Sequence, residues 1–496
     1  MILAGVKPAV IDQFRRVGMT LLWLIAAALI GLFIGTQPFG VVIIVLAFLA
    51  FVLLACVSPL AAIVIMLVLA PMRTLIATEA LVQLPLDIGQ LALIGFLLVW
   101  LINQAVRGAR LVRVFSSPVS ALLVVFVIVT GFTAFSATSL TAWLNEWLKW
   151  LQMLVLVTFT LNHFQKRRWE WLLFGLTVAA VAHAWIGIYE FFGGSGALHL
   201  LVNGRFFRAF GTFGQPNPFG GFMGLIAPVT LMATLGYSSR VWSARGSKIL
   251  SLDFGLALFY LLSSIFILVG IGMSWSRGAW VGLGVALAVT VFAIPRNTRW
   301  GLLFLGSAMG LLGILWFTGI LPRSVVERLS NSTQEFFAFE DVRGIDITPE
   351  NYAVAERLAH WQAALNMATA HPLLGVGLGN YEIVYPGYRL VNWPEPLGHA
   401  HNYYLNILAE AGIIGLLVYG KVWVGIMILS WRGRRHPDIL SRFVMIGLLG
   451  TWVYLSVHSF FDNLYVNNLF LHMGLMLGIL ATLYNQTRTH VRLGIS

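Results

Sequence analysis

Residues 39–56 read FGVVIIVLAFLAFVLLAC and contain no charged side chain. A helix of this length and apolarity spans the hydrocarbon core of a bilayer, because all of its backbone hydrogen bonds stay inside the segment. Similar runs recur along the whole chain, at about 18–36, 39–56, 59–71, 87–103, 118–135, 143–163, 170–192, 219–238, 252–274, 278–295, 300–320, 403–430, 440–460 and 466–484. The sequence therefore predicts an all-α polytopic membrane protein with about 12–14 transmembrane helices.

Two places in this pattern leave alternatives open. The third run is short, and the segment 72–86 after it is either re-entrant or interfacial. The first run follows basic residues and lacks a clear small-residue cleavage site, so we expect an uncleaved first helix.

The composition supports a membrane protein. Hydrophobic residues make up 59% of the 496 residues and charged residues only 10%, against about a quarter in soluble domains. The net charge of +12 raises the possibility of a nucleic-acid partner. We reject it, because the basic residues lie in short loops between apolar runs. The single cysteine, Cys56, excludes an internal disulfide and a cysteine-based metal site.

The basic loops also predict the orientation. Alternate loops carry the positive charges, at Lys7, Arg15, Arg16, Arg107, Arg110, Arg113, Lys166, Arg167, Arg168, Arg240, Arg245, Lys248, Arg296, Arg299, Arg432, Arg434, Arg435, Arg442, Arg488 and Arg492. The positive-inside rule places these loops in the cytoplasm. We therefore expect a bacterial cytoplasmic (inner) membrane protein with both termini cytoplasmic and an extracytoplasmic active site.

One long polar segment, residues 321–402, interrupts the apolar pattern between the eleventh and twelfth candidate spans. It holds nine of the nineteen acidic residues and five arginines. A connection of this length is usually functional. We divide the chain into a first transmembrane part at 1–320, this extracytoplasmic segment, and a second transmembrane part at 403–496.

Four arginines depart from the charge rule and are expected at or near the outer face: Arg73, Arg205, Arg208 and Arg277. An ionisable residue at membrane depth is costly and is a functional candidate. Arg205 and Arg208 belong to the glycine- and proline-rich stretch RFFRAFGTFGQPNPFG at 205–220. The guanidinium fork suits phosphate oxygens. The alternative is a capped loop whose arginines meet lipid headgroups or acidic loop residues.

The next two motifs also allow a structural interpretation. Arg277 lies in SWSRGAW at 274–280, a predicted tight turn between two spans, where it is either functional or an interfacial anchor beside two tryptophans. Arg357 begins a stretch on a predicted helix, about 351–370, that ends at a Pro-Gly stop. The glycines at 375–379 lack the Lys-Ser/Thr ending of a phosphate loop, and we interpret them as structural.

The fourth motif, GHAHNYYLN at 398–406, leads into an apolar helix. His401 at the helix mouth is a candidate general base. The His-x-His spacing of His399 and His401 also suits a metal. No partner carboxylate cluster or Asp-x-Asp motif is evident, and we predict no metal. Asp462, at a later outer turn, pairs with an arginine, orients a histidine, or only forms the turn.

These motifs together resemble the O-antigen ligase and polymerase superfamily. The resemblance covers about 205–415 and rests on RxxGTFxxPN at 208–217, SRGA at 276–279, HPLLGVG at 371–377, and HNxxL followed by ExGxxG at 401–415. The amino-terminal spans match only in being hydrophobic. Members of this superfamily usually have about twelve spans.

The resemblance implies a glycosyltransferase that needs no metal or other cofactor. It would move a glycan from a polyprenyl-diphosphate carrier to a glycan, lipid or protein acceptor in the bilayer. The implied catalytic residues are His401, Arg277 and Arg208. The expected substrate-binding residues are Arg205, Arg357, His399, Asn402 and Tyr403. The acceptor stays open between lipid core, growing polysaccharide and protein.

A function of another class, a membrane transporter, would also explain spans with charged residues. It predicts charges near the bilayer midplane and broken helices in paired repeats. The charges here cluster at one face, and no paired repeats are evident. The sequence therefore favours the enzyme.

Overall fold

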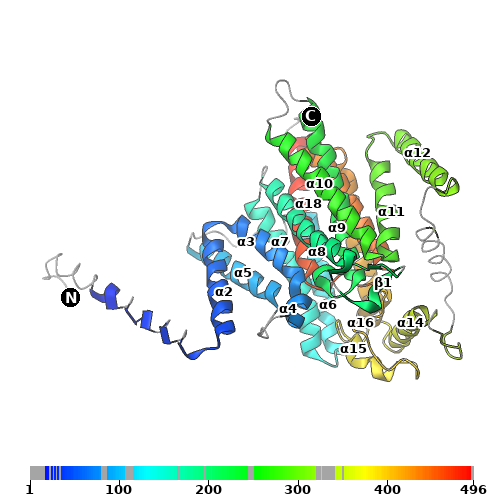
Figure 1. The fold of residues 1–496 in the computed structure, drawn as a ribbon, viewed down its shortest axis with the longest axis horizontal. Coiled ribbons are helices and arrows are strands. Elements are labelled where there is room, and N and C mark those ends of the chain that lie inside the picture. Colours follow the sequence, from blue (N-terminus) through cyan, green and yellow to red (C-terminus); the bar gives the residue numbers. More distant parts are fainter. Residues whose placement is uncertain are drawn as a thin grey trace.

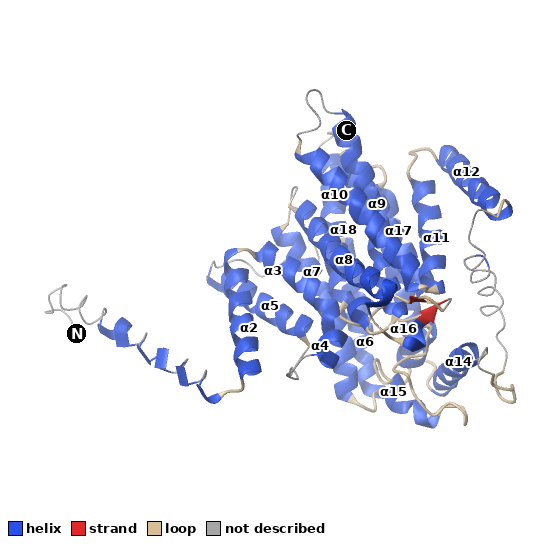
Figure 2. Ribbon diagram, in the orientation of Figure 1, coloured by secondary structure: helices blue, strands red, loops and turns tan. Residues whose placement is uncertain are grey.

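The structure is a computed structural model that describes residues 17–492, apart from 22–23, 26, 29–30, 33–34, 80–86, 107–115, 165–167, 195, 203, 244–250, 320–325, 327–340 and 349–350. Helices account for nearly all regular structure in these residues (Figure 2). The exception is a small antiparallel hairpin of β1 (Leu201–Val202) and β2 (Phe206–Phe207). The all-α prediction is confirmed.

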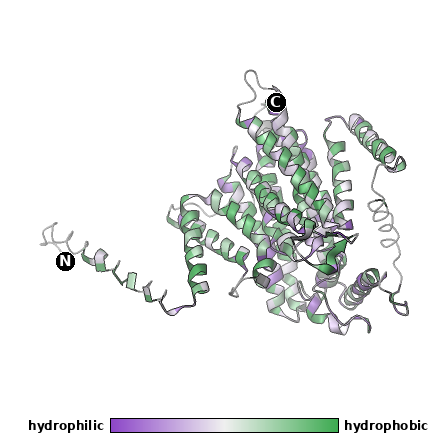
Figure 3. Ribbon diagram, in the orientation of Figure 1, coloured by the Kyte–Doolittle hydropathy of each residue, from purple (hydrophilic) through white to green (hydrophobic). Residues whose placement is uncertain are grey.

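Eleven helices in the described residues are long and apolar enough to cross a membrane. They span Phe39–Val57, Pro59–Thr78, Ile88–Val106, Pro118–Ser136, Trp169–Gly194, Pro216–Ser243, Leu252–Ser274, Thr298–Phe317, Tyr403–Gly433, Ile439–His458 and Leu469–Thr487. Two further predicted spans are the more polar α7 (Leu140–His163) and the shorter α11 (Arg277–Ala293). The predicted run at 18–36 lies partly outside the described residues. Figure 3 shows the apolar surfaces of these helices.

The third predicted span is longer than its apolar run. Helix α3 (Pro59–Leu69) continues through η1 (Ala70–Met72) into α4 (Arg73–Glu79). Residues 72–79 of the predicted re-entrant or interfacial segment are therefore helical, and they extend this span to Thr78. Residues 80–86 lie outside the described part of the chain.

The centre of the molecule is built around α9 (Pro216–Ser243), which packs against α10 (Leu252–Ser274) and α17 (Ile439–His458) (Figure 1). Small residues allow this close packing. A Cβ at Gly224 would lie 2.1 Å from the ring of Tyr454, so only glycine fits there. Without a hydrophobic driving force between helices in lipid, such close van der Waals packing holds them together.

The remaining helices surround this centre. Helix α18 (Leu469–Arg492) packs against α7, and α11 packs against α17. At the outer edge α12 (Thr298–Phe317) contacts α11, and only 6% of its most apolar window is buried. The first helices, α2 (Phe39–Val57) and α5 (Ile88–Val106), lie on the opposite side of the bundle (Figure 1). Helix α6 (Pro118–Gly131) packs against α16, and α8 (Trp169–Tyr189) packs against α10.

The polar segment contributes α14 (Tyr352–Ala370) and the short α15 (Tyr381–Val384), both at one end of the bundle (Figure 1). The predicted helix at about 351–370 is thus confirmed. Helix α14 packs against α16 (Tyr403–Gly433), the apolar helix that follows the segment.

Helix α16 is broken near its start at Gly412, where φ is 64° and ψ is −170°. Only glycine adopts this conformation readily. The glycine-rich loop covers the break: Val376 and Gly377 donate backbone hydrogen bonds of 2.9 Å to the carbonyls of Ala409 and Glu410. We call this pairing of residues 372–381 with 409–413 the glycine clip. It fixes the polar segment to the end of the membrane bundle.

Candidate functional site

Arg208 follows the β1–β2 hairpin directly, and the hairpin fixes its backbone. Its N–H donates to the carbonyl of Leu200 at 2.9 Å. Its guanidinium donates through Nε to the carbonyl of Ser274 at 3.1 Å, and through a terminal nitrogen to Oδ1 of Asn217 at 3.2 Å. These partners are neutral, so they orient the guanidinium without neutralising its charge. The buried carboxylate of Glu190 accepts the next two loop N–H groups, from Phe210 and Gly211.

Arg277 is the first residue of α11, at the sharp reversal after α10. Trp275 turns the chain in a left-handed conformation with φ 54°, as the sequence prediction of a tight turn requires. Gly278 then allows a close approach: a Cβ there would lie 2.8 Å from the Cβ of Phe461. The turn therefore packs directly against the α17–α18 loop, which carries Asp462.

The three arginines Arg208, Arg277 and Arg357 line one cavity of about 230 Å³. They come from the hairpin, the α10–α11 turn and α14, which lie far apart in the sequence. The complete lining is Arg208, Asn217, Ser276, Arg277, Gly278, Ala353, Arg357, His458, Phe461 and Asp462. Asp462 is the single carboxylate in this lining. The cavity thus presents three permanent positive charges against one negative charge, which suits an anion.

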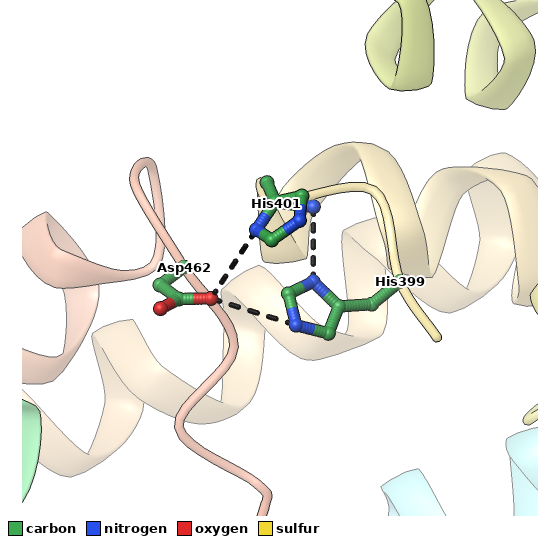
Figure 4. Close-up of side chains that lie close together, drawn as sticks. All are labelled: His399, His401 and Asp462. Atoms are coloured by element: carbon green, nitrogen blue, oxygen red, sulfur yellow. Dashed lines mark hydrogen bonds and ion pairs between the residues drawn. The ribbon is translucent and has the colours of Figure 1, made fainter. Parts of the chain in front are cut away.

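Asp462 connects this cavity to the two histidines (Figure 4). Its Oδ1 lies 3.5 Å from Nε2 of His399 and 3.7 Å from Nδ1 of His401. The carboxylate is 5% exposed and lies on the loop after α17, while both histidines precede α16. His401 is not among the residues that line the cavity, but its carboxylate neighbour is.

The hydrogen bonds indicate how the protons are placed on the two rings. The backbone N–H of His401 donates to Nδ1 of His399 at 3.0 Å, so in a neutral His399 the proton sits on Nε2 and points at Asp462. By the same geometry, a proton on Nδ1 of His401 points at Asp462. Nε2 of His401 then keeps its lone pair, which is the state that a base requires.

Burial and charge tune these groups. Burial lowers the pKa of His399 to about 4, although the charge of Asp462 opposes this. Burial alone would raise the pKa of Asp462, but the contact with His401 and the nearby His399 outweigh it and hold the pKa below its usual range. Asp462 is therefore ionised and His399 is neutral near neutral pH. Burial likewise lowers the pKa of His360, whose ring centroid lies 5.9 Å from that of His401, to about 4.

His401 itself has an unusual backbone, with φ 52°. A non-glycine residue in the left-handed region is uncommon and often marks a functional position. The next residue, Asn402, begins α16: its Oδ1 accepts hydrogen bonds from the N–H groups of Tyr404 and Leu405 at 3.0 and 3.2 Å. This cap fixes the chain immediately after His401.

The same three side chains also have metal-ligand chemistry. One ligand atom each from His399, His401 and Asp462 lies within 4.8 Å of the others. The sequence prediction of no metal depended on the absence of a nearby carboxylate, and the structure supplies one. Imidazole nitrogens and a carboxylate oxygen are common zinc ligands. The arrangement is thus open to a base–carboxylate pair or to a metal.

Three predicted substrate-binding residues lie outside the cavity lining. Arg205 is exposed, with its guanidinium carbon 5.1 Å from the ring centroid of Phe206. Asn402 caps α16, and Tyr403 is fully buried against Tyr465, with ring centroids 4.5 Å apart. Among the described residues, these three serve local structure.

The sequence did not single out two polar residues that shape the site. Glu190 lies at the end of an apolar helix, where nothing in the sequence indicates that it binds the Arg208 loop. Asp462 was one of three open interpretations. The signal that could have favoured it is its place in an outer turn that also holds His458, opposite the predicted arginines.

Comparisons with known proteins agree with this geometry. Residues 262–420 match the family model described as O-antigen ligase. This range includes Arg277, Arg357, His399 and His401. The chain is a member of the O-antigen ligase superfamily. The predicted resemblance is thus confirmed.

One curated relative of this superfamily is an O-antigen ligase of Pseudomonas aeruginosa, which is 27% identical over 232 residues. The match covers 46% of this chain and 48% of that relative, so the chain spans about half the length of the protein it matches.

Proposed function

We propose that this protein transfers a glycan from a polyprenyl-diphosphate carrier to an acceptor hydroxyl, with inversion and without a metal. The observation that carries the proposal is the cavity in which Arg208, Arg277 and Arg357 meet Asp462, the carboxylate neighbour of His401. An anion site and a base lie together there. Both are required when a diphosphate leaves and a hydroxyl attacks.

The arginines act on the leaving group. Guanidinium groups bind phosphate oxygens through two parallel hydrogen bonds, and preorganised positive charge stabilises the charge that develops during bond cleavage. Arg208 is held by a carbonyl and an amide, and Arg277 by a tight turn, so little reorganisation is needed. Held in this way, the donor would present its C1 carbon to an acceptor.

His401 acts on the acceptor. Nε2 of His401 accepts the hydroxyl proton while the acceptor oxygen forms a bond to C1 of the donor sugar. The bond between C1 and the diphosphate oxygen breaks, and the diphosphate keeps the electron pair. Attack from the opposite face inverts C1. Asp462 holds the imidazole in the required tautomer and stabilises the imidazolium that forms, much as the carboxylate does in a Ser-His-Asp triad.

We propose an O-antigen-ligase-like acceptor reaction, at the outer face of the bacterial cytoplasmic membrane, with both termini cytoplasmic. The name of the matched family and that of the Pseudomonas relative favour a ligase. Extension of a carrier-linked polysaccharide and glycosylation of a protein hydroxyl use the same donor chemistry, and we keep them as alternatives.

The test is transfer by the purified full chain. A labelled polyprenyl-diphosphate oligosaccharide is offered with lipid core, a second carrier-linked glycan or a peptide, with and without a chelator. We expect product with lipid core, unchanged by the chelator. Transfer to another acceptor would overturn the ligase assignment. Loss with the chelator that added metal restores would overturn the metal-free mechanism and favour the histidine–carboxylate metal site.

Two variants test the base. His401→Gln should lose turnover, while His371→Gln, an exposed histidine of the same segment, should retain it. Full activity in His401→Gln would remove His401 from the mechanism. Absence of product with every acceptor, together with solute movement across proteoliposomes, would favour the transporter.

A further inference from the structure

Four arginines gather at the end of the bundle opposite the site. Arg434 and Arg435 follow α16 directly, Arg442 lies in the first turn of α17, and Arg296 lies in the turn between α11 and α12. We call these four residues the arginine cluster. Helix α16 has 31 residues and starts beside His401, so at 1.5 Å per residue the cluster lies roughly 45 Å from the site.

Backbone carbonyls hold the inner members of the cluster in place. Arg434 is 4% exposed, donates to the carbonyl of Pro295 at 3.5 Å, and lies over the Trp431 ring at 3.9 Å. Arg442 donates through Nε to the carbonyl of Arg434 at 2.9 Å and through a terminal nitrogen to the carbonyl of Ile294. These contacts orient two guanidinium groups around the same short turn.

The cluster lacks a negative counterpart. No carboxylate of the described residues forms an ion pair with any of its members. The nearby Asp438 instead pairs with Arg240 at 3.3 Å and accepts from the N–H of Ser441 at 2.8 Å. Burial, together with the charge of Arg435, lowers the pKa of Arg434. Arg442 lies within the fields of Arg296 and Arg434.

Aromatic residues indicate that the cluster lies at the membrane surface. Trp431 stacks on Phe292 with ring centroids 5.6 Å apart, and Trp300 is 58% exposed. Tryptophan is enriched at the level of the lipid headgroups. The cluster is therefore at the depth where lipid phosphates lie.

We propose that the arginine cluster is a binding site for the phosphate group of an anionic membrane lipid. The positive-inside rule accounts for arginines in this loop, but it does not account for a buried arginine that is held by carbonyls among like charges. Such an arrangement is costly without a counter-anion. Basic pockets between helices on the cytoplasmic side are suited to anionic headgroups. The site is independent of the glycan chemistry at the other end.

Exposed members of the cluster provide a test that does not disturb the fold. The variant Arg296→Gln/Arg435→Gln removes two exposed charges. The control Arg299→Gln/Arg432→Gln removes two exposed arginines from the same side that are outside the cluster. Binding of phosphatidylglycerol, phosphatidylcholine and inorganic phosphate to the full chain in detergent is measured by native mass spectrometry and thermal shift.

We expect phosphatidylglycerol to bind wild type and control, and to bind the cluster variant about 30-fold more weakly, from ~1 kcal/mol for each arginine. Equal binding by wild type and cluster variant would overturn the proposal. So would equal binding of phosphatidylcholine, which shows no preference for anionic lipid. An equal thermal shift with inorganic phosphate at the same concentration would assign the site to a free anion and overturn the lipid assignment.

Discussion

Asp462→Asn is the substitution that separates the chemistry of the site from its shape. The side chain is buried, lines the cavity and lies within 3.7 Å of both histidines. Asparagine keeps the size but removes the charge, and its amide N–H₂ can face the imidazole. His401 would then be stabilised in the wrong tautomer, with its proton on Nε2 and no lone pair for the acceptor hydroxyl.

The expected loss follows from what the carboxylate does. A positioned general base contributes about 10²–10⁴-fold to a rate, and the orienting carboxylate of a triad can be worth the upper part of that range. The contact to His401 is 3.7 Å, longer than a good hydrogen bond. We therefore expect kcat to fall about 10²–10³-fold in Asp462→Asn, or ~3–4 kcal/mol in the barrier.

The assay is transfer of the labelled oligosaccharide at saturating donor, with donor KM measured separately. Asp462→Asn should lower kcat with a smaller effect on KM, because the arginines that hold the donor remain. Asp341→Asn, an exposed aspartate of the polar segment, is the matched control and should behave as wild type. A kcat within three-fold of wild type, in a variant with unchanged melting temperature, would refute the role of Asp462.

Three further predictions address the arginines, the glycine clip and pH. Arg277→Lys should lower kcat roughly 10²-fold in the transfer assay, because an ammonium cannot reproduce the planar fork, whereas Arg343→Lys should have no effect. Gly412→Ala should lower the melting temperature strongly, by an effect of ~3 kcal/mol or more, while Gly420→Ala, with open space around its Cβ, should be neutral. Burial lowers the pKa of His360 to about 4, so the unfolded state binds more protons between pH 6.5 and 4 and stability falls as pH drops through this window. His360→Gln should flatten that fall by up to ~1.4 kcal/mol per pH unit in pH-dependent melting, and an unchanged slope would contradict the assignment.

The arginines could be predicted from the sequence because each departed from a strong physical rule. Arginine is costly at the outer end of a span unless it has a partner or a function, so Arg208 and Arg277 were conspicuous. Arg357 was found through its helix. That all three line one cavity was not predictable from spacing, because it depends on how α9, α10, α14 and α17 pack.

The partners of His401 were harder to predict for the same reason. Asp462 lies sixty-one residues further along the chain, beyond α16 and α17, and no local pattern connects it to His401. Asn402 and Tyr403 were assigned to substrate because of their position beside His401. The structure gives both a local role, since an asparagine before an apolar helix is also the common pattern of an N-cap. Proximity in sequence could not separate the two roles.

The glycine clip explains why a base and an arginine from one polar segment stay in register with arginines from the membrane bundle. The break at Gly412 leaves backbone groups of α16 without helical partners, and a buried unsatisfied group costs about 1–3 kcal/mol. The loop 372–381 satisfies at least three of them, since it accepts from Ile413 and donates to Ala409 and Glu410. Opening the clip is therefore costly by several kcal/mol, and α14, with Arg357, remains docked on the helix that follows His401. The glycines at 375–379 are structural, but the structure they form sets the distance between the anion site and the base.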